Sequence, residues 1–196
     1  MDDGSLIYPN HFIAVAEDAG LVSQITELVV EMACEALSRW QHNLLAGVNL
    51  SVNLSSVDFA TRFMEKLLKI VASTPANTEL LEFELTETAL FADLDYVQEI
   101  IKEFKNHGVQ FSIDDFGTGY SSFGYLQDLD IGFLKIDRSF VQAMATNQKS
   151  TAIVKSMIDV GVNLGVKVIA EGIENAHEAE RLKSMRCHYG QGYFYA

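Results

Sequence analysis

Cysteine, proline and long apolar runs are scarce in this sequence, which has two cysteines and two prolines among 196 residues. Cys34 and Cys187 form no CxxC pattern, which argues against a disulfide framework or a zinc site and favours a reducing, cytoplasmic setting. The five histidines form no HxH or HExxH pattern, so we expect no histidine-rich metal site. No apolar stretch is long enough to span a bilayer, so we expect no direct membrane insertion by this chain. The chain could still be part of a larger, membrane-tethered protein.

Basic residues are also few, since 14 lysines and arginines stand against 27 acids, for a net charge of −13. A surface this acidic repels a phosphate backbone, so we expect no non-specific nucleic-acid binding. Bound cations can invert the local charge, so a small phosphate ester is still a possible ligand. The apolar fraction of 48% is enough for one domain with a core, although a full eight-unit barrel typically needs ~250 residues.

Short apolar or β-rich runs alternate with helical patterns along the whole chain. The runs fall near residues 47–54, 80–86, 109–114, 132–136, 167–171 and 187–194. About six strand–helix units of this kind predict an α/β fold with a parallel sheet covered by helices. Periodicity alone does not decide between an open doubly wound sheet and a closed barrel.

The sequence predicts where several helices begin or end. One is predicted to begin with Ser23 as its cap, and its apolar face would comprise Ile25, Leu28, Val29, Met32, Ala36 and Trp40. A later helix should end at Gly108 and bury Val97, Ile100, Ile101 and Phe104. Another should end at Gly165. Asn175, with Glu178 three residues later, is typical of a capping box.

Residues whose side chains offer oxygen atoms as metal ligands, and one lysine, lie at the ends of the predicted strands. In chain order they are Asn53, Glu84, Glu87, Asp114, Asp115, Lys135, Asp137 and Glu171. The carboxyl ends of parallel strands meet at one edge of an α/β sheet or barrel, where active sites lie. Carboxylates that converge there need a compensating cation, because burying them unpaired costs several kcal/mol. A single acid after a strand is more often a helix cap, but five such strand ends are hard to explain that way.

Oxygen-only ligands suit Mg²⁺ or Mn²⁺, and two such ions suit the hydrolysis of a phosphodiester. Lys135 would then stabilise phosphoryl oxygens or orient the attacking water. The tripeptide Asp115-Phe116-Gly117 also matches the metal-binding tripeptide of protein kinases. We exclude a kinase because no HRD motif, glycine-rich phosphate loop or VAIK lysine accompanies it.

Seven segments together carry a resemblance to a known family. They are PNHFIAVAEDAG (9–20), VNLS (52–55), ELTE (84–87), DDFGTGYSS (114–122), KIDRSF (135–140), AEGIE (170–174) and QGY (191–193). In this order and spacing the sequence resembles the EAL domain family over essentially its whole length. The resemblance implies a TIM-like (β/α) barrel that hydrolyses cyclic di-GMP to linear pGpG with two Mg²⁺ or Mn²⁺ ions.

The resemblance also implies roles for individual residues. The metal ligands would be Asn53, Glu84, Asp114, Asp115 and Glu171. Lys135 and Glu171 would be catalytic, and Glu87 would hold the loop after the paired aspartates. Asp137, Glu174 and Gln191 would lie on the substrate side. The VNLS repeat at 48–51 offers Asn49 as an alternative to Asn53, but Phe59 fits the family pattern that follows the second copy.

The resemblance is incomplete at the start of the chain. The family's EAL motif would precede residue 9, so we expect residues 1–196 to form a single, N-terminally incomplete domain. It would be either the retained part of a longer protein or a naturally shortened domain. Glu35-Ala36-Leu37 imitates the motif but stands inside the predicted helix that begins at Ser23.

An incomplete barrel exposes strand edges, which predicts a homodimer or a partly open barrel. The alternative function is a catalytically weak or inactive domain that acts as a cyclic di-GMP receptor or a protein-interaction module. A barrel enzyme for another phosphate ester is a third hypothesis, which the motif DDFGTGYSS disfavours.

Overall fold

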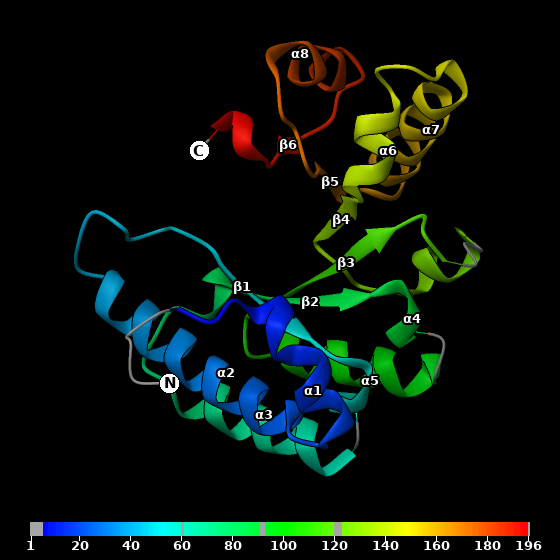
Figure 1. Cartoon of the computed structure of the whole chain (residues 1–196). Helices are drawn as coiled ribbons and strands as arrows, with labels where there is room; N and C mark the ends of the chain where they lie inside the picture. Colours follow the sequence, from blue (N-terminus) through cyan, green and yellow to red (C-terminus); the bar gives the residue numbers. More distant parts are fainter. Residues whose placement is uncertain (1–5, 60, 91–92, 120–122, 196) are drawn as a thin grey trace.

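The computed structural model describes residues 6–59, 61–90, 93–119 and 123–195. One parallel sheet contains β1 (Leu50–Leu54), β2 (Leu81–Thr86), β3 (Gln110–Phe116), β4 (Phe133–Ile136), β5 (Lys167–Ala170) and β6 (Tyr189–Gly190) (Figure 1). The helices are α1 (Ile13–Asp18), α2 (Val22–Trp40), α3 (Thr61–Ser73), α4 (Glu87–Leu90), α5 (Leu94–Lys105), α6 (Arg138–Ala143), α7 (Gln148–Leu164) and α8 (Ala176–Ser184). Short 3-10 turns occupy Pro9–His11, Ser56–Phe59, Thr78–Leu80, Phe123–Asp128 and Tyr193–Tyr195.

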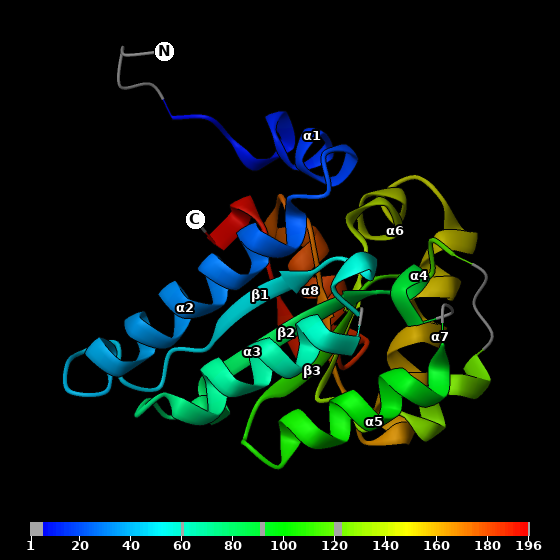
Figure 2. The same ribbon diagram turned by 90° about the horizontal axis from the view of Figure 1, so that it is seen from below.

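The strand order decides between the two predicted architectures. The strands pair in parallel and in sequence order, from β1 to β6. Right-handed crossovers between successive neighbours place every connecting helix on the same face of the sheet. Figure 2 shows α2, α3 and α5 side by side on one face. This one-sided cover is that of a TIM-like barrel wall and excludes a doubly wound sheet. Within the described residues β1 and β6 each pair on one side only, so the sheet is not closed.

The two faces of the sheet differ in chemistry because side chains alternate along each strand. The face toward the helices is apolar and includes Phe83 and Phe111, which pack edge-to-face against Phe104 of α5 with ring centroids 5.4 and 6.0 Å away. All three rings are fully buried, and each contributes about 1.5–3 kcal/mol relative to an exposed position. The opposite, concave face carries polar side chains such as Asn53 and Glu84. The fold therefore separates the core from the candidate site.

Helix α2 departs from the sequence prediction at its start and in its buried face. It begins at Val22, so Ser23 is not its cap, and the Ser23 hydroxyl donates to Asp58 instead. Leu28 and Met32 are 55% and 58% exposed, so the predicted apolar face was wrong. The buried residues are Val22, Thr26, Val30, Ala33, Cys34 and Leu37. The helical period is as predicted, but its phase differs, because small side chains let α2 pack closely against β1 and α3.

Of the other predicted helix ends, those at Gly165 and Asn175 are confirmed, whereas α5 ends at Lys105, three residues before the predicted Gly108. Helix α5 buries the four predicted residues, and α7 ends at Gly165 in the left-handed conformation with φ 75°. The Asn175 side chain accepts from the backbone N–H of Glu178, 3.0 Å away, at the start of α8. The Glu178 carboxylate accepts from the backbone N–H of Glu174 rather than from that of Asn175. Among the helices of the described ranges, none has the length and apolar character that a membrane crossing requires.

Candidate metal centre

Lys135 lies at the centre of the acids that the strand ends bring together. Strand β4 places it on the concave face, where it is 4% exposed. Its Nζ lies 2.8 Å from Glu84 Oε2, 3.1 Å from Asp114 Oδ1 and 2.8 Å from Glu171 Oε1. Burial alone would lower the pKa of Lys135, but hydrogen bonds to Glu171 and Glu84, together with the charges of Glu84 and Asp114, outweigh burial and raise the pKa above its usual value. The ammonium is therefore charged at neutral pH.

A local irregularity in β3 brings the paired aspartates to the same site. In a regular strand, successive side chains point to opposite faces, so Asp114 and Asp115 would diverge. The register of β3 against β4 shifts between Ile113 and Phe116, and Asp115 has φ 52°. Aspartate tolerates this left-handed conformation better than most residues. One oxygen each from Asp114, Asp115 and Glu171 then lie within 4.8 Å of one another, a group that could hold a metal ion.

The charge of this cluster is unbalanced within the protein. Burial raises the pKa of Glu171. Burial, followed by the charges of Asp114 and Asp137, raises the pKa of Asp115. With Glu84, Asp114, Asp115 and Glu171 ionised, four negative charges meet the one positive charge of Lys135 and leave a net charge of −3. A divalent cation that prefers oxygen ligands fits this donor set and this charge.

Glu87 lies against the loop that follows the paired aspartates. It is the first residue of α4, is 2% exposed, and its Oε2 accepts from the backbone N–H of Gly117 at 3.3 Å. A Cβ at Gly119 would lie only 3.2 Å from the Glu87 carboxylate carbon, so glycine permits this close approach. Tyr120, Ser121 and Ser122, which complete the DDFGTGYSS motif, lie outside the described residues.

Asn53 and Gln191 lie on the same concave face as the acids. Asn53 is in register with Glu84 in the pairing of β1 and β2, and its side chain is exposed. Gln191 lines a hollow of about 280 Å³ together with Glu84 and Lys135. Its backbone continues the pairing with β5, because its N–H donates to the Ala170 carbonyl. Both residues therefore border the centre.

Asp137, Glu174 and Glu35 are placed differently. Asp137 caps α6 by accepting from the backbone N–H of Ser139 at 3.0 Å, and its charge acts on Asp115. Glu174 is exposed and accepts from Gln142 Nε2 at 2.9 Å, and within the described chain it makes no hydrogen bond or ion pair to the cluster. Glu35 is an exposed residue in the middle of α2, as predicted for an imitation of the family motif.

Sequence reasoning missed Glu82, which stands two residues before Glu84 and therefore on the same face. It is 5% exposed, and burial, more than any other cause, raises its pKa. The alternation along β2 was the signal that could have found it.

We expect Glu82→Gln to stabilise the protein at neutral pH. Because the folded-state pKa lies above the ordinary value of 4.5, an ionised Glu82 opposes folding once the pH exceeds both values. Below pH 4.5 the wild-type side chain is protonated in both states, so the advantage of glutamine should disappear. Urea unfolding midpoints measured from pH 4 to pH 8 test this, and a destabilised variant at pH 7 would contradict it.

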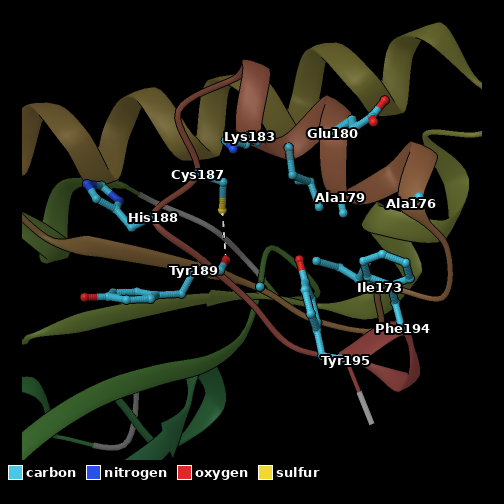
Figure 3. Close-up of a pocket in the computed structure, with 12 residues that line it drawn as sticks. Ile173, Ala176, Ala179, Glu180, Lys183, Cys187, His188, Tyr189, Phe194 and Tyr195 are labelled. Atoms are coloured by element: carbon cyan, nitrogen blue, oxygen red, sulfur yellow. Dashed lines mark hydrogen bonds between the residues drawn. The ribbon is translucent and has the colours of Figure 1, made fainter.

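A second hollow, of about 440 Å³, lies between α8 and β6 and lacks this chemistry (Figure 3). Its thiol, Cys187, donates to the Tyr189 carbonyl at 3.3 Å, and burial raises the pKa of the thiol to about 11. A thiol with so high a pKa is a poor nucleophile at neutral pH. His188 accepts through Nδ1 from the backbone N–H of Val168, which occupies that ring nitrogen. The candidate site therefore remains the cluster around Lys135.

Comparison with known sequences agrees with the motifs. The sequence model of the family described as EAL domain matches residues 1–196. The chain is 36% identical over 197 residues to the probable cyclic di-GMP phosphodiesterase PdeB of Escherichia coli, covering 99% of this chain and 37% of that protein. It is 36% identical over 189 residues to the bifunctional diguanylate cyclase/cyclic di-GMP phosphodiesterase MucR of Pseudomonas aeruginosa, covering 96% of this chain and 28% of that protein. The chain thus spans a minor part of these relatives.

Solved structures agree in fold over nearly the whole chain. The structure described as the PaMucR phosphodiesterase in complex with c-di-GMP matches with a TM-score of 0.91 at 35% identity, covering 98% of this chain and 78% of that one. The FimX EAL domain from Pseudomonas aeruginosa bound to c-di-GMP matches with a TM-score of 0.87 at 25% identity, covering 98% and 77%.

Proposed function

The chain belongs to the EAL domain family, and from that premise we propose that it is a metal-dependent phosphodiesterase that hydrolyses cyclic di-GMP to linear pGpG in bacterial second-messenger signalling. The observation that carries this proposal is the convergence of three carboxylates on Lys135 at the carboxyl ends of the strands, with a fourth, that of Asp115, beside two of them. The names of the relatives, which include cyclic di-GMP phosphodiesterases, support the choice of substrate.

The residues that would hold two Mg²⁺ or Mn²⁺ ions are Asn53, Glu84, Asp114, Asp115 and Glu171. When bound, such ions lower the pKa of an attacking water and neutralise charge that develops on the phosphoryl oxygens. Support comes from the three carboxylate oxygens within 4.8 Å and from the charge that Lys135 leaves unbalanced. All of these ligands are oxygen donors, as both ions prefer.

The reaction would form a bond between a water oxygen and one phosphorus, while the bond from that phosphorus to a ribose O3′ breaks and the leaving O3′ oxygen takes up a proton from solvent to become a hydroxyl. Lys135 is charged, so it would neutralise a phosphoryl oxygen or orient the water rather than accept a proton. Burial raises the pKa of Glu171 in the metal-free protein, and a carboxylate with a raised pKa is the better proton acceptor, so Glu171 would accept the water's proton. Glu87 would hold the loop beside Gly117. Asp137, Glu174 and Gln191 would lie on the substrate side.

The direct test is incubation of the purified chain with cyclic di-GMP and Mn²⁺ or Mg²⁺, with and without EDTA, followed by chromatography of the nucleotides. We expect linear pGpG only when metal is present. Binding of cyclic di-GMP without turnover would favour the receptor alternative. If the folded chain showed no binding of cyclic di-GMP and formed no product, both functions would be contradicted for this chain.

We also propose that two copies associate and that the protein acts in the cytoplasm. Strands β1 and β6 leave an edge unpaired within the described residues, and such edges favour pairing with a second chain. The free cysteines Cys34 and Cys187 support a reducing compartment. Sedimentation velocity would detect the dimer, and a monomer at tens of micromolar would contradict it.

A further inference from the structure

Asp58 is a fully buried carboxylate that faces hydroxyl groups and one backbone N–H. It lies in the 3-10 turn Ser56–Phe59 directly after β1 and is 0% exposed. Its carboxylate accepts from Ser23 Oγ at 2.7 Å, from Thr26 Oγ1 at 2.8 Å and from the backbone N–H of Ser55 at 2.9 Å. Within the described residues no lysine, arginine or histidine pairs with it. Burial without a cation is unfavourable, so these three donors are what makes the position tolerable.

The three donors come from two parts of the fold. Ser23 and Thr26 belong to the first turns of α2, whereas Ser55 directly follows the end of β1. The backbone N–H of Asp58 also donates to the Ser55 carbonyl at 2.9 Å, so Asp58 holds Ser55 through both of its backbone polar groups. The Ser55 hydroxyl donates in turn to Glu17 of α1 at 3.2 Å. These hydrogen bonds of Asp58 and Ser55 fix the end of β1 against α1 and α2.

Asn53 stands two residues before Ser55 and depends on this backbone for its direction. Its side chain makes no hydrogen bond to the described part of the chain and points to the concave face, in register with Glu84. The buried neighbours Val52 and Leu54 fix the strand laterally through the opposite face. The direction of the Asn53 carboxamide is therefore set by the backbone that Asp58 fixes, and not by hydrogen bonds of the carboxamide itself.

We infer that Asp58 is a positioning residue for the metal centre, which acts by fixing the end of β1 and with it the carboxamide of Asn53. The inference rests on the proposed function, in which Asn53 is a metal ligand. Groups that orient a metal ligand without touching the metal commonly change metal affinity by 10–100-fold. If the carboxylate served only to join α2 to β1, its replacement would change stability but not metal affinity.

The test measures Mn²⁺ affinity of the whole chain, from the free-Mn²⁺ signal in electron paramagnetic resonance, alongside the urea unfolding midpoint. We expect Asp58→Asn to bind Mn²⁺ about 10-fold more weakly. Arg181→Gln is the matched control, because it removes two 2.7 Å hydrogen bonds, to the Met144 carbonyl and the Thr151 hydroxyl, that lie outside the centre. It should lower the midpoint and leave Mn²⁺ affinity unchanged. If Asp58→Asn fails to fold, Thr26→Val removes one donor and carries the same expectation with a smaller loss.

A double-mutant cycle with Asn53→Ala separates this inference from the proposed function. If Asp58 acts through Asn53, adding Asp58→Asn to Asn53→Ala will weaken Mn²⁺ binding no further, although the midpoint still falls. An additive loss, or unchanged affinity in Asp58→Asn while Asn53→Ala weakens binding, would overturn the positioning role. Unchanged affinity in Asn53→Ala itself would instead overturn the ligand assignment in the proposed function, and the positioning role with it.

Discussion

Replacement of Lys135 by methionine should reduce cyclic di-GMP hydrolysis by at least about 100-fold, the usual loss when one preorganised charge is removed from an active site. The metal-free protein should also lose about 3–5 kcal/mol of unfolding free energy, because three carboxylates lose their buried counter-ion. Methionine keeps the unbranched side chain up to Cε and lacks only the charged terminal nitrogen, so the loss would reflect mainly the charge rather than a large cavity. Steady-state turnover and urea unfolding in EDTA measure the two effects.

Added Mn²⁺ should restore much of the stability of the Lys135→Met variant. The ion replaces the positive charge that the ammonium supplied, and a ligand that binds only the folded state stabilises it. Lys155→Met is the control, because Lys155 forms an exposed pair with Asp159 within α7. Exposed pairs contribute about 0–1 kcal/mol, and Mn²⁺ should not change that value. Equal stability of Lys135→Met and wild type in EDTA would show that the ammonium does not hold the acids.

The sequence predicted most of the sheet because each strand is a short apolar run next to a helix with a clear period. It failed at β6, where residues 187–194 were predicted and only Tyr189–Gly190 form a strand. The chain turns away at Gly192, whose φ is 155° and where a Cβ would lie 2.2 Å from the Ile173 carbonyl oxygen. Such a close backbone approach depends on the tertiary fold, so an apolar run alone does not reveal it.

The candidate site was predictable where it depends on strand ends and alternation, and not where it depends on distant contacts. The rule that parallel strands present their carboxyl ends together was enough to group Glu84, Asp114 and Glu171. Asp115 joins this group only because the register of β3 shifts between Ile113 and Phe116, and no residue pattern predicts that shift. Asp58 could not be predicted from local sequence, because its hydroxyl partners are 35 and 32 residues away in sequence.

Replacement of Glu171 by glutamine should produce a loss of activity like that of Lys135→Met but the opposite effect on stability. Hydrolysis should fall by at least about 100-fold, because a metal ligand and proton acceptor is lost. Mn²⁺ affinity should fall by more than about 10-fold. Burial raises the pKa of Glu171 even with Lys135 beside it, so its ionised form opposes folding above the ordinary pKa of 4.5. The metal-free variant should therefore be at least as stable as wild type at pH 7.

The pH dependence and a matched control make this expectation specific. The stability advantage of glutamine should vanish as the pH falls below 4.5, where Glu171 is protonated in both the folded and the unfolded states. Glu180→Gln removes the same charge from an exposed position on α8 and should leave turnover, Mn²⁺ affinity and the urea midpoint nearly unchanged. A Glu171→Gln variant that keeps metal-dependent turnover would remove this residue from the reaction. Lost turnover with unchanged Mn²⁺ affinity would instead assign Glu171 to proton transfer alone and leave the metal to the remaining acids.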